Sequence, residues 1–72
     1  MVLKITQRKV LKVLVENEDK SFSKSELIKL SGVPGNHVDN AVDFFMNHDY
    51  IYSPDKEGKI SVTPDGVYAY EE

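Results

Sequence analysis

Apolar residues recur at helical spacing in three stretches of the chain, separated by short polar or glycine-containing segments. The first stretch has its apolar positions at Val10, Leu11 and Leu14. Thr6 precedes it, and a threonine hydroxyl can accept a hydrogen bond from a free backbone N–H at a helix start. Residues 17–20 are polar and should end the helix. The pattern predicts a helix at about 7–17.

The second stretch opens with a capping box. Ser23 can accept from the backbone N–H three residues on, and Glu26 can reach back to the N–H of Ser23. The apolar stripe that follows consists of Leu27, Ile28 and Leu30. Gly32 lies where a left-handed residue usually ends a helix. These signals predict a short helix at about 24–31.

The third stretch follows Pro34, a residue that suits a helix start because its missing N–H costs nothing there. Its inner face carries Val38, Val42 and Phe45. At roughly 100° per residue, its polar side chains gather on the opposite face. These are Asn36, Asp39, Asn40, Asp43 and Asn47. We expect a helix at about 36–48.

Two short segments with strand composition, 50–52 and 60–62, flank a polar turn that contains Pro54 and Gly58. Together they predict a β-hairpin within about 50–63. The tail, 64–72, begins with a Thr-Pro pair that favours a helical turn, although a glycine at position 66 weakens a full helix. Tyr68 and Tyr70 are two positions apart, so on a helix one could pack inward while the other serves a contact between subunits.

The chain has 72 residues and no cysteine, so we expect a single domain over 1–72 without disulfides or thiolate metal sites. A domain of this size buries only about 60% of the surface of its unfolded chain, and a homodimer interface would add to the core. No signal peptide is visible at the start, and no stretch reaches the roughly 18 apolar residues of a membrane span. The expectation is a cytoplasmic protein without membrane contact.

The net charge of −3 hides an asymmetry. Residues 1–35 carry seven basic and four acidic residues, whereas residues 36–72 carry two basic and eight acidic ones. No Lys or Arg lies between Lys29 and Lys56. The distribution of charge along the chain therefore bears more on function than the net charge does.

The segment 23–51 resembles the helix-turn-helix of winged-helix transcriptional regulators. The matching positions are Glu26-Leu27, Gly32-Val33, Val38, Phe45 in the place of a usual leucine, and Tyr50-Ile51. The sequence Val-Thr-Pro-Asp-Gly at 62–66 is similar to the strand-to-helix junction of MarR-like and PadR-like repressors. Asp49 departs from the pattern, since glycine is common there, but Asp tolerates a left-handed backbone. The resemblance implies an α+β, mainly α, winged-helix fold. Its parts would be a three-helix helix-turn-helix core, a two- or three-stranded β-wing and a short C-terminal helical turn.

The resemblance also implies a small transcriptional regulator that binds double-stranded DNA with the helix at 36–48 and the wing. On this chain, the candidates for contacts to base edges are Asn36, His37 and Asn40. The candidates for contacts to phosphate are Lys56 and Lys59 in the wing and Lys24 and Lys29 in the second helix, with Lys9 or Lys12 as additions.

The residues also raise an objection to that function. Most DNA affinity comes from neutralising phosphates, and the outward face of the helix at 36–48 offers Asp39 and Asp43 but no Lys or Arg. An alternative is a protein-interaction module that docks a protein partner on Asp39, Asp43, Phe44 and Asn47. Phe44 lies off the inner stripe, so it is either partly exposed for such a partner or packed under the wing or against the tail.

No catalytic, metal or cofactor site is expected. His37 and His48 are eleven positions apart and have no carboxylate-and-histidine set at metal spacing. The serines near residue 23 form caps and turns without a paired base, and the glycines form no phosphate loop. The sequence predicts a protein that is not an enzyme.

Overall fold

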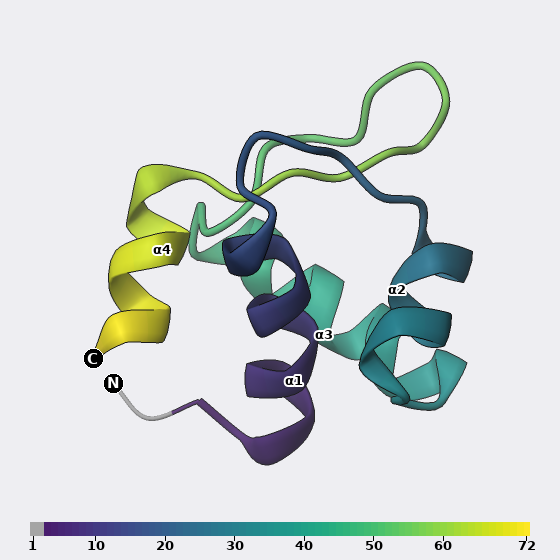
Figure 1. The fold of residues 1–72 in the computed structure, drawn as a ribbon, viewed down its shortest axis with the longest axis horizontal. Coiled ribbons are helices and arrows are strands. Elements are labelled where there is room, and N and C mark those ends of the chain that lie inside the picture. The colour runs from purple at the N-terminus through teal and green to yellow at the C-terminus, as the bar shows by residue number, and fades with distance from the viewer. Residues whose placement is uncertain (1–2) are drawn as a thin grey trace.

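The computed structural model describes residues 3–72, which form four helices and one irregular hairpin. The helices are α1 (Ile5–Glu16), α2 (Lys24–Ser31), α3 (Gly35–Asn47) and α4 (Pro64–Glu71). Helix α1 contacts each of the other three, and α2 and α4 lie on opposite sides of it (Figure 1). The fold is mainly helical. None of the helices in residues 3–72 combines the length and the apolar character needed to cross a membrane.

The core lies between α1, α2, α3 and the hairpin, and the apolar stripes found in the sequence supply it. Among the described residues, no polar or charged side chain is buried. The largest fully buried side chains are Phe45, Leu11, Leu14, Leu27, Ile60, Val10, Val38 and Val42. Since these residues come from three helices and one arm of the hairpin, the hairpin is part of the core.

Helix α1 begins two residues earlier than the sequence predicted, and its N-cap is Lys4, so Thr6 lies inside the first turn. The side chain of Gln7 accepts a hydrogen bond from the backbone N–H of Lys4 at 3.0 Å, so Gln7 serves the cap at Lys4 and the expected cap at Thr6 is wrong. Leu3, just before the cap, is buried and anchors the chain there. The helix ends at Glu16, where the Asn17 side chain donates to the carbonyl of Val13 at 2.9 Å.

The capping box of α2 is confirmed. The Ser23 N–H donates to the Glu26 carboxylate at 3.0 Å, and the Glu26 N–H donates to the Ser23 hydroxyl at 3.2 Å. Gly32 ends the helix in the left-handed region with φ 72°. Pro34 lies at the N-cap of α3 rather than inside it, because its carbonyl accepts from the N–H groups of His37 and Val38 at 3.0 Å. Helix α3 accordingly spans residues 35–47 instead of 36–48.

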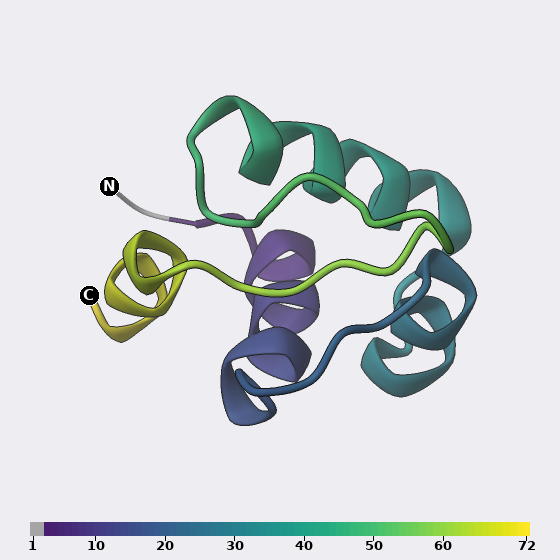
Figure 2. The ribbon, with the colours of Figure 1, turned by 90° about the horizontal axis from the view of Figure 1, so that it is seen from above.

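The hairpin segment runs across α1 from α4 towards α2, alongside α3 (Figures 1 and 2). Three chain segments meet there in antiparallel single bridges, Phe22 with Ile60 and Ile51 with Val62. Within residues 3–72 these single bridges stand in place of continuous strands, so the hairpin is more irregular than the predicted two- or three-stranded sheet.

The turn of the hairpin is held by Asp55, whose carboxylate accepts from the N–H groups of Glu57 and Lys59, both at 2.9 Å. Gly58 supplies the left-handed residue of this turn with φ 76°. Asp49, at the start of the hairpin, has φ 58°, as its place in the sequence pattern predicted. Local side-chain hydrogen bonding thus orders a loop that has little strand pairing.

The tail forms a full eight-residue helix, α4, where the sequence indicated a helical turn. The Thr63 hydroxyl caps it by accepting from the Gly66 N–H at 3.1 Å. Gly66 weakens a helix intrinsically, but here its missing side chain allows α4 to approach the hairpin: a Cβ at this position would lie 2.1 Å from the carbonyl oxygen of Tyr50. Arg8 of α1 donates to the carbonyl of Tyr70 at 3.1 Å and fixes the other end of α4.

Candidate nucleic-acid interface

The outward face of α3 carries the polar residues that the sequence placed there. Its rotational setting is fixed by three buried residues on the inner side, Val38, Val42 and Phe45. The exposed side chains are Asn36, His37, Asp39, Asn40, Asp43 and Asn47. Their amide and imidazole groups could both donate and accept hydrogen bonds, which is the chemistry needed at base edges.

A lysine from α2 lies against this face. The Lys24 Nζ is 3.1 Å from the Asp39 carboxylate, and the two side chains are 49% and 60% exposed. A pair this exposed adds less than about 1 kcal/mol to stability, so its main consequence is where it places the lysine charge. It brings a cation to α3, which has none of its own, and it neutralises one of the two carboxylates that the sequence analysis counted against DNA. No spacing rule predicts this pair, because it joins two helices across a turn.

The hairpin also approaches α2. The backbone N–H of Ser23 lowers the pKa of the Glu26 carboxyl, the Ser23 hydroxyl adds to this effect, and the charge of Lys59 lowers that pKa further. Lys59 is half-buried near the α2 N-terminus, whereas Lys56 is exposed at the hairpin tip. Asp55, which shapes this tip, is not among the candidates predicted from the sequence, although its Asp-Lys-Glu-Gly run is a turn signal that could have identified it.

The remaining candidate lysine, Lys29, is exposed in the last turn of α2. Among the described contacts, none joins Lys29 or Lys56 to the face of α3. The structure therefore brings Lys24 to Asp39 on the outward face of α3 and Lys59 to the N-terminus of α2, and leaves Lys29 and Lys56 exposed elsewhere on the surface.

Phe44 packs into an aromatic cluster at the start of the hairpin. Its ring centroid lies 4.3 Å from that of His48, 6.0 Å from that of Phe45 and 6.2 Å from that of Tyr50. Its side chain is half-buried against the core. The cluster accounts for Phe44 as a packing residue under the hairpin, one of the two readings left open by the sequence. Asp43 and Asn47 remain exposed.

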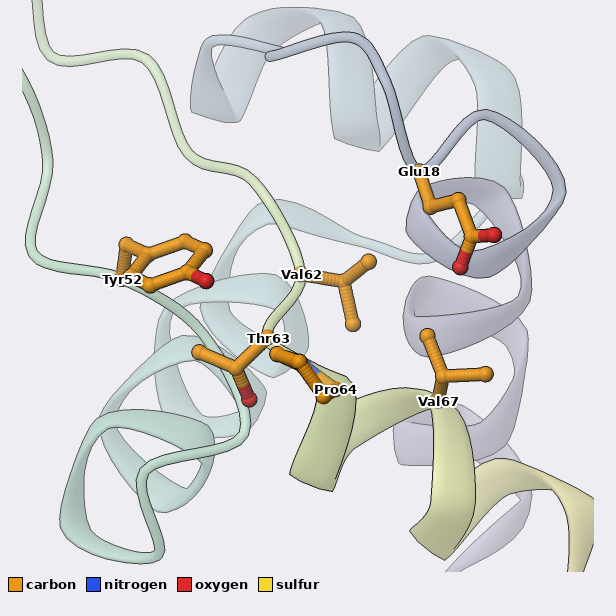
Figure 3. Close-up of a pocket in the computed structure, with 6 residues that line it drawn as sticks. All are labelled: Glu18, Tyr52, Val62, Thr63, Pro64 and Val67. Carbon is orange, nitrogen blue, oxygen red and sulfur yellow. The ribbon is translucent and has the colours of Figure 1, made fainter.

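A pocket of about 420 Å³ lies at the root of the hairpin (Figure 3). Tyr52 and Glu18 stand on opposite sides of it, with Val62, Pro64 and Val67 between them. None of the described lining residues is Lys or Arg, so the pocket adds no phosphate contact. Within residues 3–72, no group of three or more His, Asp or Glu side chains is arranged to hold a metal ion.

No protein-family model matches the sequence, and no curated protein sequence matches it. Solved structures do match. BpsR of Bordetella bronchiseptica, whose DNA binding is regulated by 6-hydroxynicotinic acid, is 18% identical, with a TM-score of 0.82 over 96% of this chain and 50% of its own. MepR, a transcription regulator of the Staphylococcus aureus multidrug efflux pump MepA, is 19% identical, with a TM-score of 0.78 over 96% of this chain and 53% of its own.

A third match has the same size as the chain itself. The DNA-binding TubR fragment from Clostridium botulinum is 26% identical, with a TM-score of 0.75 over 99% of this chain and 96% of its own. The chain spans about half the length of the first two proteins and nearly all of the third. All three are described as DNA-binding proteins or transcription regulators. The resemblance noted in the sequence is thus confirmed at the level of fold: the chain has the winged-helix-like fold of small transcriptional regulators.

Proposed function

We propose that this protein is a winged-helix DNA-binding regulator that inserts α3 into the major groove and uses the hairpin at 50–63 as its wing. The proposal is supported by the fold and by neighbours that are DNA-binding regulators. A fold hosts many functions, so the site itself has to carry the assignment.

The observation that carries it is the ion pair between Lys24 and Asp39. The α3 sequence alone presents two carboxylates to a groove lined by phosphates, which is repulsive. With Lys24 at 3.1 Å, Asp39 is neutralised and the cation lies at the edge of the face that would enter the groove. When a phosphate approaches, the Lys24 ammonium can keep its contact with Asp39 and donate a second N–H to a phosphate oxygen, since it carries three donors and both side chains of the pair are exposed.

Within this arrangement, Asn36, His37 and Asn40 contact base edges, and Asn can pair with the N6 and N7 positions of adenine. Lys24, Lys29, Lys56 and Lys59 contact phosphates from α2 and the hairpin. Two copies bound side by side on DNA would present α3 twice and read two half-sites about one helical turn apart.

The test is binding to mixed-sequence duplex DNA by fluorescence anisotropy as salt is raised. If the four lysines each neutralise one phosphate, log Kd should change with log salt with a slope of about 3.6 per copy. Affinity should then fall about 150-fold between roughly 50 and 200 mM salt. An absence of binding even at the lowest salt would contradict the proposal.

Two sets of variants distinguish residues that contact phosphates from residues that contact bases. Lys56→Ala with Lys59→Ala should weaken binding to all sequences alike, whereas Asn40→Ala should change the order of preferred sequences at a cost of about 1–3 kcal/mol at one position. Equal loss on every sequence for both sets would argue against base reading by α3.

The second candidate, a protein-interaction module, is favoured by the exposure of Asp43 and Asn47. It is less supported, because Phe44 packs on its own chain and Asp39 is paired. Replacing Asp39 and Asp43 with Lys distinguishes the DNA-binding function from the protein-interaction function. A docked basic partner would be lost in a pull-down, while DNA affinity would rise.

A further inference from the structure

Helix α4 has one tyrosine turned inward and one turned outward. Tyr70 is half-buried, and the Arg8 guanidinium carbon lies 5.2 Å from its ring centroid. Tyr68 is 68% exposed. An aromatic side chain this exposed on a well-formed helix is a feature of interaction surfaces, because it can bury a large area at little cost in side-chain entropy.

Acidic residues flank this tyrosine. Asp65 and Glu71 lie three positions before and after Tyr68, so they are its neighbours on the surface of α4. Both are exposed. The outer side of α4 therefore presents an aromatic ring between two carboxylates, which we call the α4 stripe.

A groove of matching character lies between α1 and α2. It has a volume of about 260 Å³ and is lined by Lys9, Lys12, Val13, Glu16, Leu30 and Ser31. Leu30 is 57% exposed, which is high for a leucine on a helix that packs against two others. The groove offers apolar surface from Val13 and Leu30 beside two ammonium groups, with Glu16 as its single carboxylate.

We propose that the α4 stripe of one copy docks in the α1–α2 groove of a second copy. Tyr68 enters beside Leu30, and Asp65 and Glu71 face Lys9 and Lys12 across the contact. The charges of the two surfaces are opposite, and each surface has exposed apolar side chains beside its charges. The occupant is a second copy because the chain itself carries both halves of the contact.

The geometry makes this contact head-to-tail. Helices α4 and α2 lie on opposite sides of α1, so a copy that uses its α4 stripe leaves its own groove open for another copy (Figure 1). A heterologous contact of this kind continues as an open chain unless its rotation closes a ring. Neither surface includes α3 or the hairpin, so association leaves these two elements uncovered, although the groove contains Leu30 and Ser31 of α2, which follow Lys29 directly.

Asp43 and Met46 of α3 form another acidic and apolar surface on the described residues. It fits the groove less well, because Met46 is only 40% exposed and the neighbouring Asp39 is already paired with Lys24. A variant at Met46 therefore belongs in the test.

The test is sedimentation velocity of the purified protein without DNA over a range of concentrations. The wild type should grow beyond a dimer, and its growth should weaken as salt screens the flanking charges. Tyr68→Ala should weaken association at least about 30-fold, since truncating a central interface aromatic costs on the order of 2 kcal/mol. Tyr52→Ala is the matched control, because Tyr52 is also exposed, at 54%, but lies on the hairpin.

A mixing experiment tests the polarity of the contact. Lys9→Glu with Lys12→Glu blocks the groove, and Tyr68→Ala blocks the stripe, so neither variant should associate alone. Mixed together, they retain one intact groove and one intact stripe and should stop at a heterodimer. Circular dichroism of each variant checks that all of them fold.

Four results would overturn the proposal. These are a wild type that stays monomeric at every concentration, a wild type that stops at a dimer, equal loss from Tyr52→Ala and Tyr68→Ala, or loss from Met46→Ala in place of Tyr68→Ala. Because no nucleic acid is present, the outcome is independent of the proposed DNA binding.

Discussion

The substitution Gly66→Ala sets local helix propensity against tertiary packing. Alanine is better than glycine in a helix by about 1 kcal/mol, so the sequence of α4 taken alone predicts that the variant is more stable. In the structure, the added Cβ would lie 2.1 Å from the Tyr50 carbonyl oxygen and 2.6 Å from a methyl carbon of Val62. A carbon normally approaches a carbonyl oxygen no closer than about 3.3 Å. The start of α4 and the hairpin must therefore separate by about 1.2 Å, since backbone atoms cannot rotate away as a side chain can.

The cost of this separation has two parts. Overpacking of a well-filled site costs about 1–3 kcal/mol. The same movement strains the hydrogen bond that the Thr63 N–H donates to the Tyr50 carbonyl at 3.0 Å, and such a bond contributes about 0.5–1.5 kcal/mol. After subtracting the gain of about 1 kcal/mol in propensity, Gly66→Ala should lower the free energy of unfolding by about 0.5–3.5 kcal/mol. A domain of this length has on the order of 4–11 kcal/mol in total.

The assay is urea unfolding followed by circular dichroism. With an m-value near 1 kcal/mol per molar urea, the midpoint should fall by about 0.5–3.5 M. Gly35→Ala is the matched control, because its Cβ would meet only the end of the Ile28 side chain at 3.3 Å, and Ile28 is partly exposed and free to adjust. The control should stay within about 0.5 kcal/mol of wild type. An unchanged or higher midpoint for Gly66→Ala would refute the packing argument.

Two further predictions concern the N-terminus of α2. Lys24→Ala should weaken binding to every duplex and reduce the slope of log Kd against log salt by about 0.9. The control is Lys20→Ala, at an exposed site outside the interface, which should leave this slope unchanged. Equal slopes for wild type and Lys24→Ala would show that Lys24 does not contact phosphate. The second concerns Glu26, whose pKa is held below its ordinary value of 4.5 chiefly by the Ser23 backbone N–H. A lowered folded-state pKa gives stability that is present above the unfolded value and is lost as pH falls through the folded one. Thermal melting below about pH 4.5 should therefore show a steeper loss for wild type than for Glu26→Gln, and parallel curves would contradict this.

Much of the local structure could be predicted because its signals lie within a few residues. The box formed by Ser23 and Glu26 and the glycine after α2 act over less than two turns, so they are visible in the sequence. The start of α1 was misplaced, because Thr6 is a good cap by type while Gln7 and the buried Leu3 decided in favour of Lys4. Capping depends on which residue the packing brings to the helix end, and the sequence shows only which residues are able to cap.

The residues of the candidate site also fall into those that the local sequence predicts and those that only packing brings together. The exposed asparagines of α3 follow from helical periodicity once the inner stripe is known. The cation beside them does not, because Lys24 and Asp39 come together only through the angle at which α2 meets α3. Phe44 could be read as exposed or packed until the start of the hairpin was placed over it.

The sequence by itself determined where α2 and α3 form and which of their faces are apolar, because periodicity and caps are properties of neighbouring residues. Only the tertiary structure decided that the tail is a full helix and that its glycine lets α4 approach the hairpin closely. It also decided that the acidic face of the third helix is partly neutralised from the second. Each of these outcomes depends on the distance between atoms far apart in the chain, such as the Gly66 backbone and the Tyr50 carbonyl, and such distances are set when the elements pack.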